Sequence, residues 1–559
     1  MSAVPLKEFL IDFGYHPLFW PFALFAPFLV FFLGVTRLRP LCRHVALSKY
    51  AAAAWAVVLL AAFGAAAWAN LFSAEFPDHV QPSVACSSAL FWRGQPVYQD
   101  FATPERYSLV YGPLLFAGIA LSQGLLGATV IATKLPGTLA AVGALVLTFL
   151  VIARATNRLT ALSFTGLAAA LLLHSFHLSF SVRGDPFILL AVALGLWAAT
   201  QERSRTAVLL GLCVGAAVNM KLHSLAYFLP IFAIAWRQNW SRQARIGGAI
   251  VAGITILAPF LVFPQVSLAN YLGLLKVASH HPPGTEEFRG TLEWCVALAF
   301  PALFALGIMQ VRMEDFTRRF LREESVYLAA LCVAFLLILV PASKVGAGKH
   351  HFMPFIPIAM LFAARVASVS LKSYLFRSSG PAIATALAFS WIAGCSIASL
   401  RAASFTFQTA RADNAEAQHC LDDLMRARAE HPESVLLVIP GDDAGYKRTF
   451  GRFRLIFDGM PVGIDSCAVM DFLRGDAAEV DLLALSRAAM KQHRKPVLCL
   501  APRDAAPFSM RTFYPPAGPL FSDKVRSDFN RNFTRIGATE FFDVYQPRAS
   551  ALEETPGAR

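Results

Sequence analysis

Long apolar runs separated by short basic loops dominate this sequence and restrict the folds open to it. A run of about 17–25 apolar residues is long enough for a helix to cross a bilayer. Such runs recur between residues 17 and 400, and the chain of 559 residues is 56% hydrophobic and only 15% charged. An ordinary soluble domain does not have this composition. We therefore expect a mainly α-helical, polytopic membrane protein.

The runs predict about twelve transmembrane helices, because a helix satisfies its own backbone hydrogen bonds inside the bilayer. The predicted spans are 17–36, 47–72, 131–153, 160–180, 185–200, 206–220, 222–236, 246–264, 292–311, 326–341, 352–370 and 380–400. A further run, Leu109–Leu126, is expected to lie flat on the outer surface. This choice leaves the basic clusters on one side, as the positive-inside rule prefers. Those clusters are Arg37/Arg39/Arg43, Arg154/Arg158, Arg203/Arg205, Arg237/Arg242/Arg245, Arg312/Arg318/Arg319/Arg322 and Lys372/Arg377.

The formal net charge of +13 comes mostly from these clusters. Since short basic loops orient a membrane protein, we discount a nucleic-acid partner. The nine cysteines show no spacing typical of a metal site. Four of them would face an oxidising space, where no disulfide pairing can be read from the sequence. These four are Cys86, Cys420, Cys467 and Cys499.

The chain changes character after Leu400. Short strand-like runs ("SVLLVIP", "EVDLLAL", "KPVLCLAP") alternate with helical stretches such as "EAQHCLDDLMRARAEH". About 150 residues of this kind are enough for one α/β domain. We expect residues 1–400 to form the membrane domain, with a first large external loop at 73–130, and residues 401–559 to form an extracytoplasmic α/β domain.

Two carboxylates, Glu75 and Asp78, follow the apolar run that ends near residue 72. An acid at the membrane surface that is partly desolvated is a better acceptor for the proton of a hydroxyl group. A plainer interpretation also stays open, in which the two acids end a helix at the water interface.

The predicted external face also carries a set of basic side chains. These are Arg183, Lys221, Lys344, Lys349, His350 and His351. Their natural counter-ion is a phosphate group at the level of the lipid headgroups. A base together with a phosphate clamp suggests group transfer from a lipid phosphate.

Structural alternatives stay open for several of these residues. Arg183 and Asp185 could pair to close the turn in "SVRGDP". Lys221 could extend to the interface as a snorkelling side chain. His350 and His351 could be interfacial polar residues or ligands of a divalent ion, although the sequence offers no convergent acid beside them.

Four stretches together resemble the GT-C superfamily of glycosyltransferases that use polyprenyl-phosphate sugars. The first external loop, "DHVQPSVACSSALFWRGQPVYQDFATPERYSLVYGPLLF", is similar to that of the branch containing protein mannosyltransferases and lipid A aminoarabinose transferases. "RGDPF", "GAAVNMKLHSLAYFLP" and "GKHHFMPFIP" follow in the order that this family shows. The resemblance covers about the first 400 residues. Relatives commonly carry Asp-Glu where this chain has Asp78-His79.

The resemblance implies inverting transfer of a sugar from a polyprenyl-phosphate donor to an extracytoplasmic acceptor. Because of the departure at His79, the catalytic base is assigned to Asp78, with Glu75 as second choice. Lys221, Lys349, His350, Arg183 and Lys344 are assigned to the donor phosphate. Asp100, Tyr107, Tyr111, Asp185 and His351 are assigned to the substrate pocket. No cofactor is implied, and a divalent metal is not supported.

A lipid or solute transporter or flippase of the cell envelope is the alternative function. Such a protein normally places charges at the bilayer midplane and shows two related halves, whereas here the ionisable residues gather on one predicted face and no repeat is found. The Ala- and Arg-rich composition suits a GC-rich bacterial genome. In a bacterium we expect the protein in the inner membrane, with the C-terminal domain in the periplasm and undecaprenyl or decaprenyl phosphate as the carrier. The sequence names neither the sugar nor the acceptor, which could be a lipid, a polysaccharide or a protein. It also leaves metal dependence and oligomeric state open.

Overall fold

The computed structural model describes residues 45–100, 102–174, 176–312, 314–370, 393–394, 396–404, 407–408, 414–472, 479–514 and 518–553. The chain divides into two compact units. The first comprises Met1–Asn70, Gly137–Ile256 and Pro283–Thr409, and the second comprises Leu71–Pro136, Leu257–Pro282 and Ala410–Arg559. The expected division into domains at 1–400 and 401–559 stays a prediction.

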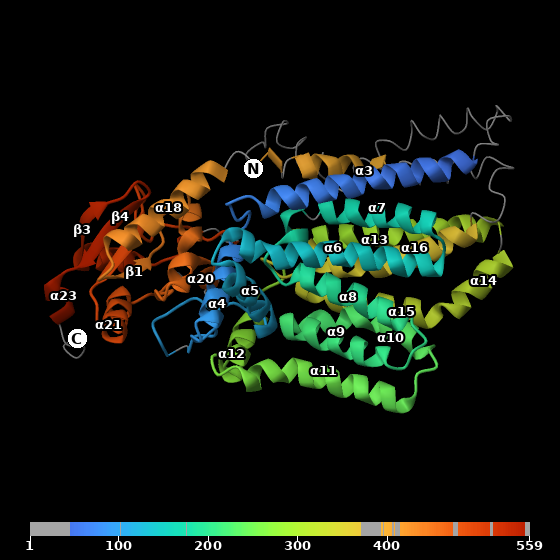
Figure 1. Ribbon diagram of the computed structural model, residues 1–559, viewed down its shortest axis with the longest axis horizontal. Coiled ribbons are helices and arrows are strands. Elements are labelled where there is room, and N and C mark those ends of the chain that lie inside the picture. The colour runs from blue at the N-terminus through green and yellow to red at the C-terminus, as the bar shows by residue number, and fades with distance from the viewer. Residues whose placement is uncertain are drawn as a thin grey trace. The chain divides into compact units, whose positions relative to one another are not determined.

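The first unit is built from helices (Figure 1). The helices and 3-10 turns that lie wholly or mostly in it are α3 (Val45–Leu71), α6 (Val130–Ala155), α7 (Arg158–His174), η2 (Phe176–Phe180), α8 (Asp185–Ala199), α9 (Thr206–Met220), η3 (Leu222–Phe228), α10 (Leu229–Trp236), α11 (Arg242–Val262), α13 (Thr285–Arg312), α14 (Glu314–Glu323), α15 (Ser325–Ala342), η4 (Lys349–Phe355) and α16 (Ile356–Ser370). In the described part of the chain, five helices are long and apolar enough to cross a membrane. The molecule is therefore a membrane protein.

The predicted spans between residues 47 and 370 all coincide with helices. The correspondence is closest at α8, α9 and α15, where the predicted and observed bounds differ by a single residue at most. The predicted span 17–36 and most of 380–400 lie outside the described residues, as do the basic clusters at 37–43 and 372–377. The helical character of the apolar runs is confirmed, whereas the total of about twelve spans stays a prediction.

Small residues bring two helices of the first unit into close contact. A Cβ atom added to Gly211 on α9 would lie 2.1 Å from the carbonyl oxygen of Gly248 on α11. A Cβ atom on Gly248 would in turn lie 2.5 Å from the carbonyl oxygen of Ala207. Membrane helices pack without a hydrophobic driving force, so close backbone approach through small residues is what holds such a pair together.

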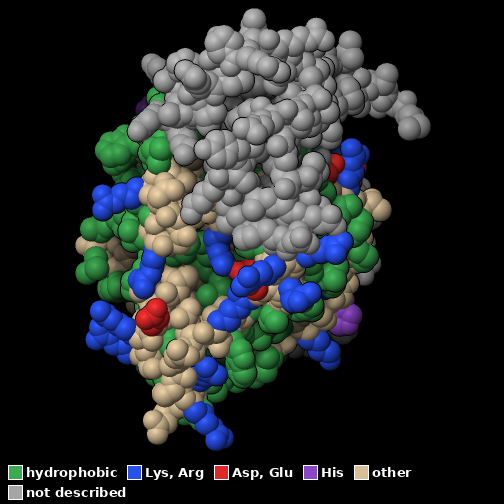
Figure 2. Space-filling view, turned by 90° about the vertical axis from the view of Figure 1, so that its right-hand side faces the viewer, with side chains coloured by type: hydrophobic (Ala, Val, Ile, Leu, Met, Phe, Trp, Pro, Cys, Tyr) green, Lys and Arg blue, Asp and Glu red, His purple; other side chains and the backbone are tan. Residues whose placement is uncertain are grey.

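Basic loops gather at one end of the first unit. Arg154 Nη1 donates to Gln201 Oε1 at 2.5 Å, just beyond the end of α8. Arg237 and Arg365 both pair with Glu324, at 3.1 and 2.7 Å. Figure 2 views the molecule toward this end and shows many more Lys and Arg side chains than acidic ones. Because α8 is 15 residues long, its first residue lies about 22 Å from this basic end.

The second unit combines helices with a small sheet. Its elements are α4 (Val80–Trp92), α5 (Pro113–Leu126), α12 (Leu268–Ser279), α18 (Asn414–Glu430), β1 (Val435–Val438), η5 (Tyr446–Arg452), α19 (Phe453–Phe457), α20 (Ser466–Phe472), α21 (Leu482–His493), β2 (Val497–Pro502), α22 (Asp523–Asn532), β3 (Phe533–Ala538), β4 (Phe542–Pro547) and α23 (Ala549–Glu553). The strand order is β1-β2-β4-β3. β1 and β2 are parallel, and β4 is antiparallel to both β2 and β3.

Of the three strands predicted in this unit, the first and the last in the sequence are confirmed and the middle one is wrong. "SVLLVIP" contains β1 and "KPVLCLAP" contains β2, and every residue of both strands is buried. "EVDLLAL" instead enters helix α21, because Asp481 accepts a hydrogen bond from the Ala484 backbone N–H and caps a helix there. The sequence reasoning did not predict α12, which Ser267 caps in the same way, or the hairpin of β3 and β4.

The contact between Gly211 and Gly248 predicts a selective loss of stability. Gly211→Leu forces α9 away from α11, which costs about 1–3 kcal/mol of unfolding free energy. Gly247→Leu is the matched control on α11, since no atom lies within 4 Å of a Cβ there. Thermal unfolding of the protein in nanodiscs checks this, and equal melting temperatures for the two variants would contradict the close contact.

Candidate functional site

A buried carboxylate lies at the start of α8 in the first unit. Asp185 is the first residue of α8, and Pro186 follows it in the first turn, where proline is well tolerated. The Asp185 side chain is only 2% exposed. Lys221 Nζ donates to Asp185 Oδ1 at 2.6 Å, and Arg183 Nε lies 3.7 Å from Oδ2. Two cations therefore compensate the one buried negative charge.

Lys221 reaches this carboxylate from a break between two helical segments. α9 ends at Met220, Lys221 has extended backbone angles of φ −146° and ψ 120°, and η3 begins at Leu222. The lysine side chain is only 8% exposed. A buried ammonium group that pairs with Asp185 differs from the snorkelling side chain that the sequence left open. The alternative pairing of Arg183 with Asp185 is present, at the longer distance.

A third segment joins these two through His350. Arg183 Nη2 lies 3.2 Å from His350 Nε2, and His350 belongs to η4, which packs against α8. Gly348, just before η4, has φ +127°, a backbone conformation that glycine adopts most readily. We name Arg183, Asp185, Lys221 and His350 the charged cluster. With the histidine neutral, this cluster carries a net charge of +1.

Two more histidines lie beside the charged cluster. The ring centroids of His350 and His351 are 4.4 Å apart, and those of His351 and His223 are 5.1 Å apart. Tyr227 Oη donates to the His351 carbonyl oxygen at 2.7 Å, which fixes this part of η4. Sequence reasoning missed His223 and Tyr227, although both stand in the quoted stretch "GAAVNMKLHSLAYFLP". The position of His223 could have indicated its place in the site, since it follows the predicted site residue Lys221 by two residues.

Lys344 and Lys349 lie outside the charged cluster. Lys349 is the first residue of η4, and its side chain is exposed. Lys344 is half-buried in the preceding loop, where it forms an isolated β-bridge with Pro283. Among the described residues, the ion pairs of Asp185 are those with Arg183 and Lys221.

Asp78, in the second unit, caps the first turn of α4. Its Oδ1 atom accepts hydrogen bonds from the backbone N–H groups of Val80 at 2.8 Å and Gln81 at 3.0 Å. These two donors fix the orientation of the carboxylate at the start of α4. The side chain is half-buried.

Glu75 is held more firmly than Asp78. Its carboxylate forms an ion pair with Lys447, and its side chain is only 9% exposed. The buried Lys134 donates to the carbonyl oxygens of Ser73 at 3.0 Å and Glu75 at 2.5 Å, so the backbone here is also fixed. Glu75 would have to give up its ion pair with Lys447 before it could act as a base.

A second buried ion pair anchors α4, and sequence reasoning missed it. Arg452 pairs with Asp465, and their side chains are 4% and 0% exposed. Asp465 Oδ1 also accepts from Ser83 Oγ on α4 at 2.9 Å and from the Cys467 N–H at 2.9 Å. Burial alone would lower the pKa of Arg452, but the adjacent Asp465 carboxylate holds that pKa above its ordinary value. No local pattern marks these two residues, because they meet only in the folded chain.

The remaining residues assigned to the substrate pocket shape the first external loop. Asp100 Oδ1 accepts from the Ala102 N–H at 2.9 Å, and Asp100 is exposed. Tyr107 Oη donates to the Pro96 carbonyl oxygen at 2.9 Å. Tyr111 is buried, and its carbonyl oxygen accepts from Tyr98 Oη at 2.7 Å. These contacts stabilise a loop conformation, and a role toward substrate stays a prediction for all three.

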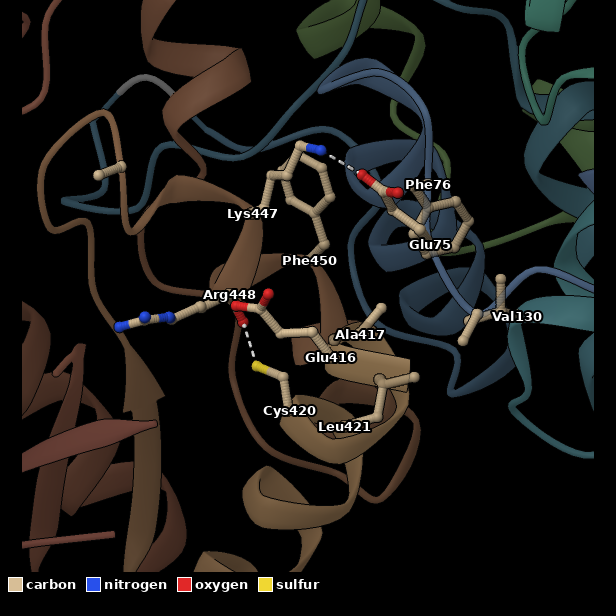
Figure 3. A pocket seen from close by; sticks show the side chains of 13 residues that line it. Glu75, Phe76, Val130, Glu416, Ala417, Cys420, Leu421, Lys447, Arg448 and Phe450 are labelled. Carbon is tan, nitrogen blue, oxygen red and sulfur yellow. Dashed lines mark hydrogen bonds and ion pairs between the residues drawn. The ribbon is translucent and has the colours of Figure 1, made fainter. Parts of the chain in front are cut away.

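A cavity of about 200 Å³ opens beside Glu75 in the second unit. Figure 3 shows the Lys447 ammonium group pointing at the Glu75 carboxylate on one side of it, with Glu416, Ala417, Cys420 and Leu421 of α18 on another. Phe76 and Phe450 add apolar surface. Within the described residues, no group of three His, Cys, Asp or Glu side chains is arranged to hold a metal ion, and the seven cysteines there are free thiols.

Comparison with known structures identifies the fold. ArnT from Cupriavidus metallidurans in the apo state superposes with a TM-score of 0.52 at 12% sequence identity, over 90% of this chain and 100% of ArnT. The same protein bound to undecaprenyl phosphate gives a TM-score of 0.51 at 13% identity, over 90% and 99% of the two chains. No family model matches the chain, and no curated protein matches it by sequence. The chain has the fold of the GT-C glycosyltransferases, as the sequence resemblance led us to expect.

The anchor of α4 yields a stability prediction. Asp465→Ala leaves the buried Arg452 guanidinium uncompensated and is expected to cost about 3–5 kcal/mol. Asp523→Ala, in the exposed pair with Arg526, is the control and is expected to change the stability by less than about 1 kcal/mol. Denaturant or thermal unfolding of both variants in nanodiscs measures the difference. Similar losses for the two would show that the buried pair does not anchor α4.

Proposed function

We propose that the protein is an integral membrane glycosyltransferase of the GT-C type. It transfers a sugar from a polyprenyl-phosphate donor to an extracytoplasmic acceptor with inversion at the anomeric carbon. We place it in a bacterial inner membrane, with about twelve spans and with residues 401–559 as a periplasmic α/β domain. The fold alone does not establish this activity, so the support must come from the site.

The charged cluster is the observation that carries the proposal. Ionised side chains inside a membrane unit are costly and persist mainly where function needs them. Here Arg183 and Lys221 outnumber the one carboxylate, Asp185, so the cluster is suited to an anionic group. A phosphate satisfies this excess of positive charge and accepts hydrogen bonds from guanidinium and ammonium donors.

The solved neighbour supports the same donor class. ArnT from Cupriavidus metallidurans, whose fold this chain shares, has been crystallised bound to undecaprenyl phosphate. A polyprenyl phosphate of this kind is therefore the donor carrier that we propose for the present protein.

In the proposed reaction Asp78 acts as general base. It takes the proton of the acceptor hydroxyl while the hydroxyl oxygen forms a bond to the anomeric carbon. The bond between that carbon and the phosphate oxygen breaks, and the polyprenyl phosphate departs as an anion. Because the leaving group is already stable as an anion, the reaction needs cations rather than a general acid.

The other assigned residues take supporting roles. Arg183, Lys221 and His350 bind the phosphate, and Asp185 orients Lys221. Lys344 and Lys349, which lie outside the charged cluster, add positive charge that attracts the anionic donor. His351, Asp100, Tyr107 and Tyr111 contact the substrates, and Glu75 is the second carboxylate near Asp78 in the sequence.

Donor binding tests the role of the charged cluster. Undecaprenyl phosphate should bind to the purified protein in nanodiscs, and Lys221→Met should weaken this binding at least tenfold. Lys349→Ala should have a smaller effect, because its side chain is exposed, and Lys276→Met on α12 is the neutral control. If no polyprenyl phosphate binds to the wild type, the proposed function is wrong and the transporter alternative gains support.

Transfer tests the role of Asp78. Asp78→Asn keeps the size of the side chain but removes the basic carboxylate, so transfer should fall by about 10²–10⁴-fold while donor binding is retained. Asp481→Asn, which alters another helix-capping aspartate, controls for the capping contribution. Full activity of Asp78→Asn would exclude Asp78 as the base.

A further inference from the structure

The cavity beside Glu75 has the chemistry of a small binding site. Its volume of about 200 Å³ lies below the roughly 300–1,000 Å³ typical of sites for drug-sized ligands, so it has room for about one ring. Its walls combine an apolar surface with charged groups at the edge (Figure 3). This combination suits a ligand with both apolar faces and polar substituents.

The charges around the cavity favour an uncharged ligand rather than a phosphate. Two carboxylates, Glu75 and Glu416, and one ammonium group, Lys447, face it. Arg448 also lines the cavity, but its guanidinium lies over the ring of Phe541 and donates to the Arg503 carbonyl oxygen at 2.9 Å. Figure 3 shows this guanidinium directed away from Glu75. The carboxylates therefore outnumber the available cation and disfavour an anion.

Glu75 is a preformed hydrogen-bond acceptor in this cavity. Its side chain is 91% buried, and Lys134 fixes the backbone of residues 73 and 75. The Ala74 N–H also donates to Asn414 Oδ1 at 2.5 Å, which attaches this wall to the first residue of α18. Lys447, by contrast, is 62% exposed and can move to let a ligand enter.

We propose that this cavity binds an uncharged sugar ring of the acceptor. The ring lies against the apolar lining of the cavity, to which Phe450 contributes, and its hydroxyls donate to Glu75 and Glu416. Glu75 and Asp78 are three residues apart, so their Cα atoms lie within about 11 Å of each other. A glycan or glycolipid held here would present a neighbouring hydroxyl near Asp78. The inference rests on the proposed function and narrows its acceptor to a sugar-containing molecule.

Binding of methyl glycosides tests the proposal. The probes are the methyl glycosides of mannose, glucose, galactose and arabinose, observed by saturation-transfer difference NMR. The protein is held in phosphatidylcholine nanodiscs, free of detergents with sugar headgroups. We expect at least one glycoside to bind and Ala417→Trp, which fills the cavity, to weaken that binding at least tenfold. Ala415→Trp, exposed on the same helix, is the matched control and should bind as the wild type does.

A milder variant and a second ligand complete the test. Glu416→Gln should weaken glycoside binding severalfold without disturbing the fold, whereas Glu430→Gln, exposed at the end of α18, should not. Undecaprenyl phosphate binding, measured on the same samples, should be unchanged in all four variants. The proposal is overturned if no glycoside binds or if the substitutions at positions 416 and 417 leave glycoside binding unchanged. It is also overturned if Ala417→Trp abolishes donor binding instead. Failure of the wild type to bind undecaprenyl phosphate would refute the proposed function and leave the glycoside result standing.

Discussion

The buried ion pair between Asp185 and Lys221 holds together the charged cluster of the first unit. Each ion loses its hydration when it is placed among apolar helices, and only close pairing offsets that cost. The distance of 2.6 Å between Lys221 Nζ and Asp185 Oδ1 meets this requirement. The pair connects the start of α8 to the break between α9 and η3, and Arg183 extends it to His350 on η4. Three segments that are far apart in the sequence therefore meet at one set of charges.

The charged cluster has a net positive charge and lies far from the basic loops of the first unit. A pair of one acid and one base carries no net charge, whereas the second cation, Arg183, gives the charged cluster a net charge of +1 when the histidine is neutral. The basic loops lie at the opposite end of the first unit, beyond the C-terminus of α8. Positive loops usually remain on the cytoplasmic side of a membrane, so this separation is consistent with a site on the external side. A lipid phosphate in the outer leaflet would then meet the charged cluster.

Sequence reasoning predicted the apolar helices well because their pattern is local. The sequence drew attention to Arg183, Lys221 and His350 because these basic residues interrupt or border apolar runs, and their assignment to the donor phosphate stays a prediction. Pairing of Arg183 with Asp185 was one of the alternatives that the sequence offered, whereas pairing of Lys221 with Asp185 was not predicted, because it depends on the way α8 and α9 pack. The anchor formed by Arg452, Asp465 and Ser83 was missed for the same reason. Nor could the strand-like run "EVDLLAL" be recognised as helical without the capping role of Asp481.

The most direct measurement is the position of the donor phosphate in the protein. A cryo-electron microscopy map of the protein in nanodiscs with undecaprenyl phosphate would locate it without relying on the effect of a mutation. We predict that the phosphate lies within hydrogen-bonding distance of Lys221 Nζ and the Arg183 guanidinium, and that Asp185 keeps its contact with Lys221. A phosphate bound away from both cations, with the charged cluster unchanged, would contradict the central role of these residues in donor binding.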